Sequence, residues 1–403
     1  MMCYHMLAKA YFQEEGNQLR RSIICWMLVL LLASGCGTTA RPPENTQGAA
    51  SDTPGTANRE GPAEQSKSFF AMDTYMSLRF WGGSDGLPEK AEQLVLDMEA
   101  ALSTTAEDSE IACLNDSGDG ELSADTAELL GRALELCGEL NGALDISIYP
   151  VVRAWGFTNP EGGYRVPAPE ELQELLAQVD YRRVSLDGTH ARLEPGMQID
   201  LGAVTKGCLG DRLSRLLCEN GVKSGLLDLG GNIQVIGMKP DGTPWRIGVQ
   251  DPAGDSYLGV LAVSDCAVVT SGGYERYFID ENGTLHWHIL DPADGFPAEN
   301  GLISVTVVGS EGLYCDALST GLFILGPERA MDFWQARRDF EMVLVTEDRQ
   351  ILLTPALASR FKPSEDCGYE IEVIADAKNE NLDMDRRFDS SDLRPALLAC
   401  SDG

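Results

Sequence analysis

The feature that most constrains the fold is the alternation of strand and helix patterns between residues 68 and 374. Amphipathic helices are expected at 87–104, 124–140, 170–179 and 206–221. Strands are expected at 68–82, 224–229, 233–238, 245–250, 259–264, 267–270 and 303–309. Long antiparallel runs of strands with helices between them indicate an α+β fold rather than a doubly wound sheet. We therefore predict one large domain of mixed, largely antiparallel sheets packed with helices.

The amino terminus has the order of regions that is typical of an export signal. Arg20 and Arg21 precede an apolar run at 23–32, and small residues lead to Cys36. The run is shorter than the ~20 apolar residues that a spanning helix needs. The pattern predicts a lipoprotein signal peptide over 1–36, with Cys36 as the lipidated residue. An uncleaved anchor helix is the alternative. The prediction places the protein on the extracytoplasmic face of a bacterial cell membrane, held by its lipid anchor.

Two segments outside the alternating region lack a pattern that could bury a core. Residues 37–67 are rich in Pro, Gly, Thr and Ser and almost free of large apolar side chains. Residues 375–403 are polar and acidic. We predict a disordered tether over 37–67 and a disordered acidic tail over 375–403, on either side of a domain at 68–374.

The charge balance excludes one class of partner. Lys and Arg number 31 against 63 Asp and Glu, which gives a net charge of −32. Because such a surface repels polyanions, nucleic acid is not expected as a partner. A ligand that carries phosphate would need a metal ion or a local cation. The eleven cysteines form no CxxC pair, so zinc and iron–sulfur sites are not expected, and disulfide pairing stays open.

The segment at 314–326, YCDALSTGLFILG, places polar residues on a helix that otherwise resembles protein core. Asp316, Ser319 and Thr320 share one helical face because they are three or four residues apart. An ionised carboxylate on a buried helix is costly unless it has a partner. The sequence therefore predicts a partner for Asp316.

The segment IDLGAVTKGCLGDRL at 199–213 joins a strand to a helix. The helix is expected to begin near Lys206, with Thr205 as its N-cap. A lysine in the first turn opposes the helix dipole, unless an anion is bound there. The glycine spacing is not that of a phosphate-binding P-loop, because Cys208 stands at the position of its lysine.

Two histidines lie two residues apart in HWHILDP. An extended strand would place His286 and His288 on the same face. Such a pair could bind a transition metal, but no third soft ligand is near in the sequence. A surface strand pair is the simpler interpretation, and it fits His286 better than His288.

Ordered blocks between 68 and 374 resemble those of the ApbE family, the FAD:protein FMN transferases. The blocks are NGALDISIYPVVRAWGF (141–157), IDLGAVTKGCLGDRL (199–213), DLGGNIQVIGMKPDGTPWRIGVQDP (228–252), VVTSGGYERYF (268–278), HWHILDPADGFPA (286–298) and SVTVVGSEGLYCDALSTGLFILG (304–326). MDTYMSLRF and DSEIACLND are weaker matches near the start. Several motifs in one order are more specific than a single glycine signature.

The resemblance implies a Mg²⁺ site. In the family, the matching Asp and Thr hold the ion together with a main-chain carbonyl ahead of the lysine block. Carried over, the ligands are Asp316, Thr320 and the carbonyl of Ala203. Oxygen-only ligation suits a hard cation. Ser319 either assists the site or bonds to the helix backbone.

The resemblance also implies residues that contact the flavin nucleotide. They are Met72, Ala143, Leu144, Asp145, Lys206, Ser271, His288 and Ile289. Two positions depart from the family pattern. Leu144 replaces a usual Phe, which removes a stacking contact, and Asp73 replaces a usual Gly.

The activity that the resemblance implies is cleavage of FAD and transfer of FMN to a Ser or Thr hydroxyl of a partner, with release of AMP. Asp316 and His288 are the expected catalytic residues, and the general base is either His288 or a nearby carboxylate. The expected partners are exported flavoprotein domains, such as subunits of Nqr-type sodium-pumping quinone reductases or Rnf-type complexes. Two alternatives remain: an FAD pyrophosphatase that releases FMN and AMP, and a non-catalytic flavin-binding lipoprotein.

Overall fold

The computed structural model describes residues 62–158 and 163–375. The predicted signal peptide, most of the predicted tether and nearly all of the acidic tail lie outside these residues. The first strand, β1, is Glu64–Ala71, so the folded region begins four residues before the predicted boundary at 68. The segment 64–67, predicted as tether, pairs with the second strand of a hairpin instead.

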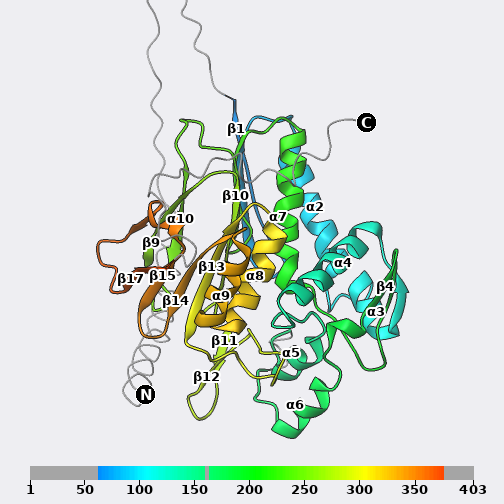
Figure 1. Ribbon diagram of the computed structural model, residues 1–403. Helices are drawn as coiled ribbons and strands as arrows, with labels where there is room; N and C mark the ends of the chain where they lie inside the picture. Colours follow the sequence, from blue (N-terminus) through cyan, green and yellow to red (C-terminus); the bar gives the residue numbers. More distant parts are fainter. Residues whose placement is uncertain (1–61, 159–162, 376–403) are drawn as a thin grey trace, which may run out of the picture. The chain divides into compact units, whose positions relative to one another are not determined.

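A nine-stranded sheet forms the centre of the fold (Figure 1). In spatial order its strands are β1 (Glu64–Ala71), β2 (Thr74–Trp81), β6 (Ser224–Asp228), β7 (Asn232–Ile236), β10 (Cys266–Gly272), β13 (Leu302–Gly309), β14 (Glu341–Thr346), β15 (Gln350–Leu353) and β17 (Glu370–Val373). Neighbouring strands are antiparallel up to β15, and β15 pairs with β17 in parallel. The predicted α+β class with largely antiparallel strands is confirmed.

Three small sheets and a set of helices surround the central sheet. The small sheets are β8 (Trp245–Gln250) with β9 (Tyr257–Val263) and β16 (Phe361–Pro363); β3 (Asp119–Glu121) with β5 (His190–Arg192) and β4 (Ser185–Asp187); and β11 (Tyr277–Ile279) with β12 (Leu285–Trp287). The helices are α2 (Leu87–Leu102), α3 (Glu110–Ser117), α4 (Ala124–Glu139), α5 (Tyr149–Trp155), α6 (Pro169–Leu176), the 3-10 helix η2 (Tyr181–Arg183), α7 (Gly202–Glu219), α8 (Gly312–Leu325), α9 (Pro327–Arg337) and α10 (Pro355–Ala358). Within the described residues, none of these helices combines the length and apolarity that crossing a membrane requires.

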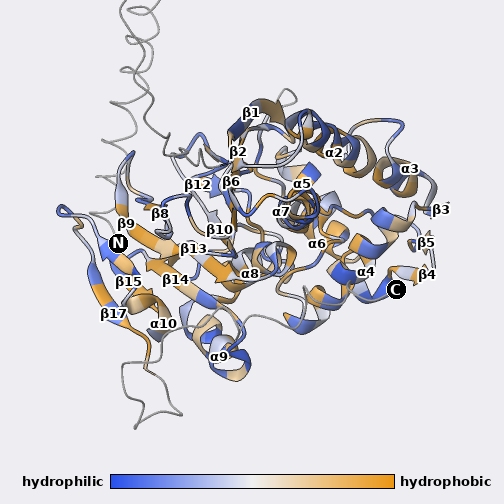
Figure 2. Ribbon diagram, turned by 90° about the horizontal axis from the view of Figure 1, so that it is seen from above, coloured by the Kyte–Doolittle hydropathy of each residue, from blue (hydrophilic) through white to orange (hydrophobic). Residues whose placement is uncertain are grey.

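The two faces of the central sheet have different covers. Along β10, Ala267 and Val269 belong to the core beneath α7 and α8, whereas Cys266 and Val268 belong to the core beneath the β8–β9–β16 sheet. This alternation follows from the two-residue period of a strand. Figure 2 shows the apolar colouring of β9 and β14 and the hydrophilic outer sides of α2 and α9. Both faces are therefore buried, and α8 lies directly against β10 and β13.

The first strand prediction, at 68–82, is wrong because the segment is a hairpin. β1 and β2 are antiparallel neighbours, with Ala71 opposite Thr74. The turn residues Met72 and Asp73 have φ angles of 50° and 57°, the left-handed conformation of a two-residue hairpin turn. A non-glycine residue is unfavourable there, which explains why glycine would suit position 73.

Helices α7 and α8 cross at unusually close range. A Cβ atom on Gly207 would lie 2.2 Å from the carbonyl oxygen of Gly312, so only glycine fits at this crossing.

The predicted start of α7 near Lys206 is wrong, because the helix begins at Gly202. Thr205 is inside the helix, where its hydroxyl donates to the carbonyl of Leu201 rather than capping the helix.

The described cysteines are all free thiols: Cys113, Cys137, Cys208, Cys218, Cys266, Cys315 and Cys367.

Candidate active site at the crossing of α7 and α8

Asp316 lies on the face of α8 that meets α7. Its side chain is buried, and its Oδ2 accepts a hydrogen bond from the Gly207 main-chain N–H at 2.8 Å. Removal from water raises the pKa of Asp316 to about 6, and the positive charge of Lys206 opposes that rise. The predicted partner of Asp316 is therefore a main-chain N–H of the crossing helix together with the nearby ammonium group.

Lys206 is held at the site rather than extended into solvent. Its Nζ donates to the carbonyl oxygen of Gly230 at 3.3 Å, and the side chain is half-buried. Its charge lowers the pKa values of both Asp316 and Glu275, so it faces two carboxylates. The predicted place of Lys206 in the first helical turn is wrong, because α7 begins at Gly202. Its ammonium group itself, rather than the helix N-terminus, can face a bound anion.

A chain of hydroxyl groups continues from Asp316 along α8. Ser319 donates to the main-chain oxygen of Asp316 at 2.9 Å. Ser271 Oγ lies 2.8 Å from Ser319 Oγ and 3.3 Å from Thr320 Oγ1. Each hydroxyl has one hydrogen, so Ser271 donates to Ser319 and Thr320 donates to Ser271. This arrangement leaves the lone pairs of the Thr320 oxygen able to accept a cation, and it gives Ser319 a bond to the helix backbone.

The carbonyl of Ala203 belongs to the same neighbourhood. In a regular α-helix its partner is the N–H four residues later, which is that of Gly207. The N–H of Gly207 donates to Asp316, so Ala203 lies one helical turn before this contact with α8. Asp316 and Thr320 share one face of α8. A carboxylate, a hydroxyl and a carbonyl oxygen are donor types that suit a hard divalent cation such as Mg²⁺.

The structure adds three charged residues that the sequence motifs contained but that we did not single out. Glu275 keeps solvent contact, yet the surrounding protein raises its pKa to about 7, with Lys206 and Arg276 opposing the rise. Arg276 donates to the carbonyl of Phe157 at 3.2 Å. Burial raises the pKa of Asp200, and the positive charge of Arg276 opposes that rise too. Glu275 and Arg276 follow Ser271 in one motif, so a charged pair after the TSGG sequence was the available signal.

His288 is held in one tautomer. Its main-chain N–H and its Nδ1 both contact the carbonyl oxygen of Arg276, at 3.0 Å and 3.1 Å. A carbonyl only accepts, so Nδ1 carries the proton and Nε2 keeps a free lone pair. Burial, together with the Arg276 charge, lowers the pKa of His288 to about 4. The ring is therefore neutral at pH 7 and can accept a proton at Nε2.

His286 does not pair with His288. It is buried, and its ring lies 5.2 Å from the Trp155 ring and 5.1 Å from the Phe278 ring. Its Nε2 faces Asp280 at 3.3 Å. The surface interpretation of His286 is wrong, because an aromatic cluster around α5 covers this strand.

The predicted flavin-contacting segment at 143–145 follows α4, and Leu140, the residue after that helix, packs against α8 at Gly321. The carboxylate of Asp145 accepts hydrogen bonds from Ser147 and, at 3.0 Å, from the N–H of Tyr181. Asp145 therefore fixes the loop itself. Leu144 is buried in the main core, and Ala143 packs at its edge.

Met72 and Ile289 occupy the borders of the site. Met72 is half-buried, and its N–H donates to Glu99 at 2.6 Å. Thr74, two residues later, packs against Gly230, whose carbonyl holds Lys206. Ile289 is buried next to His288. Contact of Met72, Ile289 and the 143–145 segment with a flavin stays a prediction.

Comparison with known proteins identifies the family of this chain. The model of the ApbE family matches residues 72–344, more than half of the chain. The chain belongs to the ApbE family. An FAD:protein FMN transferase from Klebsiella pneumoniae is 32% identical over 310 residues, covering 74% of this chain and 94% of the relative. One from Treponema pallidum is 32% identical over 295 residues, covering 68% and 81%.

Solved structures of the ApbE family share the fold. The ApbE protein of Thermotoga maritima superposes with a TM-score of 0.68 at 28% identity, covering 75% of this chain and 97% of that one. The flavin transferase ApbE of Vibrio cholerae gives a TM-score of 0.64 at 27% identity, covering 76% and 98%. The site at the α7–α8 crossing thus lies in the part of the chain that the ApbE family model covers.

We expect Lys206→Met to raise the pKa of Glu275 above its present value of about 7. The substitution keeps the side-chain length but removes the charge that opposes the rise. Titration of the carboxyl carbon by NMR measures the shift, with Lys239→Met, on the loop after β7, as the control. An unchanged pKa of Glu275 would show that the ammonium group does not face it.

Proposed function

We propose that this ApbE family member is an FAD:protein FMN transferase. The observation that carries the proposal is the bond from the Gly207 N–H to the Asp316 carboxylate at the α7–α8 crossing, with Thr320 on the same face of α8 and Lys206 next to Gly207. An oxygen donor set next to a fixed cation suits the diphosphate of a dinucleotide better than a neutral ligand. The activity of the relatives from Klebsiella pneumoniae and Treponema pallidum agrees with that chemistry.

The reaction exchanges one phosphorus–oxygen bond for another. The hydroxyl oxygen of an acceptor Ser or Thr forms a bond to the FMN phosphorus of FAD. The bond from that phosphorus to the bridging oxygen breaks, and AMP leaves with the bond's electron pair. The hydroxyl proton passes to a base of the protein. Such transfers depend on in-line positioning and charge neutralisation.

The residues present fit Mg²⁺, with Asp316, Thr320 and the Ala203 carbonyl as ligands. The ion would polarise the diphosphate and neutralise its charge. The protein's own contribution is to hold these oxygens on two rigid helices. Ser271 orients Thr320 by accepting its hydroxyl hydrogen.

Lys206 and Arg276 supply positive charge where the substrate is negative. The chain has a net charge of −32, and two cations act on one exposed carboxylate, Glu275, so their positive charge attracts anions to the site. Lys206 is tethered to Gly230, so its ammonium group is positioned before the substrate arrives. We propose that it binds a phosphate oxygen of FAD.

Two groups are candidates for the proton acceptor. His288 offers a neutral Nε2 lone pair, and Glu275 has a pKa near neutrality. We propose His288, because its Nδ1 is fixed by the Arg276 carbonyl and its base form exists throughout the neutral range.

We further propose that the protein acts at a bacterial membrane surface, anchored through lipid on Cys36, on acceptor domains such as the exported flavoprotein subunits of Nqr- or Rnf-type complexes. The support is the sequence order of the first 36 residues. A tether of roughly 30 residues would let the domain reach acceptors on the same surface.

Asp316→Asn is expected to lower FMN transfer by at least about 100-fold, because it removes the charged ligand but keeps an oxygen for the Gly207 N–H. The measurement is in-gel flavin fluorescence of a denatured acceptor domain after incubation with FAD and Mg²⁺. Asp187→Ala, an exposed carboxylate on β4, is the control. FMN and AMP released without an acceptor would favour the pyrophosphatase. Tight FAD binding with no product and no response to Mg²⁺ would favour the binding protein.

The pH dependence of kcat/KM separates the two proton acceptors. A base works only when it is deprotonated, so activity falls below its pKa. If His288 is the base, the acidic limb lies near pH 4; if Glu275 is the base, it lies near pH 7. At a Mg²⁺ concentration that saturates the site, which would keep Asp316 ionised, we expect activity to persist at pH 5.5 in the wild type and in Glu275→Gln. A limb near pH 7 under these conditions would overturn the assignment to His288.

Cys36→Ser is expected to abolish incorporation of labelled fatty acid and to release the protein from the membrane fraction. Serine has no thiol to accept the diacylglyceryl group. Cys113→Ser, an exposed thiol on α3, is the matched control. A Cys36→Ser protein that stays in the membrane fraction would favour the uncleaved anchor helix.

A further inference from the structure

The two helices that build the site carry the same short pattern. Residues 207–211 read GCLGD and residues 312–316 read GLYCD, so each has a glycine followed four residues later by an aspartate. The glycines are the points where α7 and α8 cross. A spacing of four residues places each aspartate one turn beyond its glycine on the same face.

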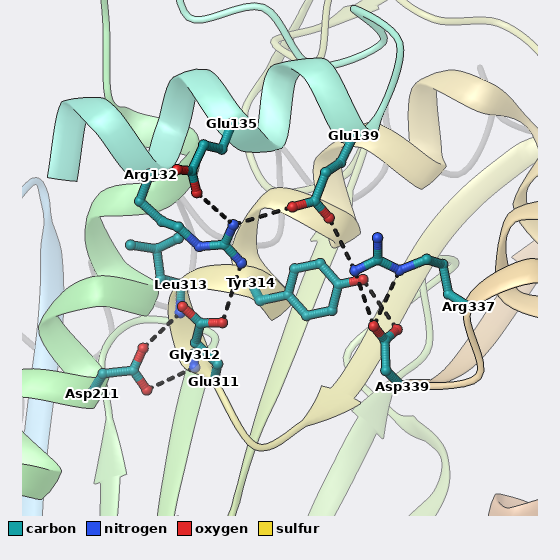
Figure 3. A network of polar contacts seen from close by, with 10 residues as sticks. All are labelled: Arg132, Glu135, Glu139, Asp211, Glu311, Gly312, Leu313, Tyr314, Arg337 and Asp339. Carbon is teal, nitrogen blue, oxygen red and sulfur yellow. Dashed lines mark hydrogen bonds and ion pairs between the residues drawn. The ribbon is translucent and has the colours of Figure 1, made fainter. Parts of the chain in front are cut away.

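The two aspartates make reciprocal bonds. Asp316 of α8 accepts from the Gly207 N–H of α7 at 2.8 Å. Asp211 of α7 accepts from the Gly312 N–H of α8 at 2.7 Å and from the Leu313 N–H at 2.9 Å. Figure 3 shows both oxygens of Asp211 directed at the first turn of α8. Each helix thus supplies the carboxylate that satisfies main-chain N–H groups of the other.

The glycines make this exchange possible. A Cβ on Gly312 would lie 2.6 Å from the Gly207 carbonyl oxygen, and one on Gly207 would lie 2.7 Å from Asp316 Cβ. Any larger residue would separate the helices and lengthen both sets of bonds. The first turn of α8 has no side-chain cap of its own, so Asp211 provides the cap from another helix.

The two aspartates differ in how many of their carboxylate oxygens are left for a ligand. Both oxygens of Asp211 are used by N–H groups, and burial raises its pKa to about 7. Asp316 gives one oxygen to Gly207 and faces the Lys206 charge. Asp211 therefore suits a structural task, whereas Asp316 suits a ligand.

We propose that Asp211 is a positioning residue for the cation site. By fixing the start of α8 against α7, it sets the distance between the ligands on α8, Asp316 and Thr320, and the Ala203 carbonyl on α7. The proposal rests on the proposed function, because that function supplies the cation. Residues that orient metal ligands affect metal affinity about 10- to 100-fold when they are changed.

A simpler role for Asp211 is general stabilisation of α8, and a matched control separates the two. Tyr314 lies in the same first turn, where its hydroxyl contacts Asp339 at 3.1 Å, and Figure 3 marks no hydrogen bond between Tyr314 and Asp211. Tyr314→Phe loosens the start of α8 without altering the reciprocal bonds. Asp211→Asn keeps the shape but places an amide N–H₂ against one main-chain N–H.

The experiment compares the full-length wild type, Asp211→Asn and Tyr314→Phe. The first readout is the shift in thermal unfolding midpoint produced by increasing Mg²⁺ without FAD, and the second is the exchange rate of the Gly207 amide by NMR. We expect Asp211→Asn to raise the half-saturating Mg²⁺ concentration at least about tenfold and to speed Gly207 exchange. Tyr314→Phe should leave both unchanged.

Two results would overturn the proposal. In one, Asp211→Asn keeps the wild-type response to Mg²⁺. In the other, both variants lose that response in proportion to their lost stability. Neither readout needs an acceptor or turnover, so a protein that binds Mg²⁺ but transfers no FMN would overturn the proposed function while the role of Asp211 was still measured.

Discussion

The hydrogen bond from the Gly207 N–H to the Asp316 carboxylate is the interaction on which the site depends. A buried carboxylate is costly, and here its cost is offset by a main-chain donor and a nearby ammonium group. The bond can form only because the helices cross at glycines. The chemistry of the site therefore requires the close packing of α7 on α8. The sheet beneath α8 holds this crossing rigid through β10 and β13.

Electrostatics explains how an acidic protein can attract a phosphate-bearing substrate. The excess of acidic residues lies over the whole sequence, whereas Lys206 and Arg276 meet beside the site. Their charges limit the rise in the pKa of Glu275 that the surrounding protein causes. The positive charge of Arg276 also helps to keep His288 neutral. Positive charge at one place in an otherwise negative molecule directs anions to that place. The same charges prepare a neutral imidazole for proton transfer.

Local patterns predicted the helices α2, α4, α6 and α7 and the strands β6, β7, β10 and β13, because burial on one face imposes a clear period on an element such as α4 or α7. They failed where tertiary contacts override local signals. The pattern at 68–82 predicts one strand, whereas the chain forms a hairpin over 64–81 whose turn uses Met72 and Asp73 rather than glycine. Thr205 resembled an N-cap, yet α7 begins three residues earlier, where Asp200 accepts the Gly202 N–H. The sequence predicts His286 at the surface, but the Trp155 ring packs against it in the folded chain.

The sequence by itself determined the fold class and the order of the motifs. It also placed Asp316, Ser319 and Thr320 on one helical face, because spacing on a helix is fixed by covalent geometry. The ligand role of Asp316 and Thr320 was implied by the resemblance to the ApbE family. Only the tertiary structure decided their partners. The bonds from Gly207 to Asp316, from Ser271 to Ser319 and from Gly312 to Asp211 each join segments far apart in the chain, and no local period connects their two ends. Protonation states followed from that packing as well, since burial and neighbouring charges set the pKa values of His288 and Glu275.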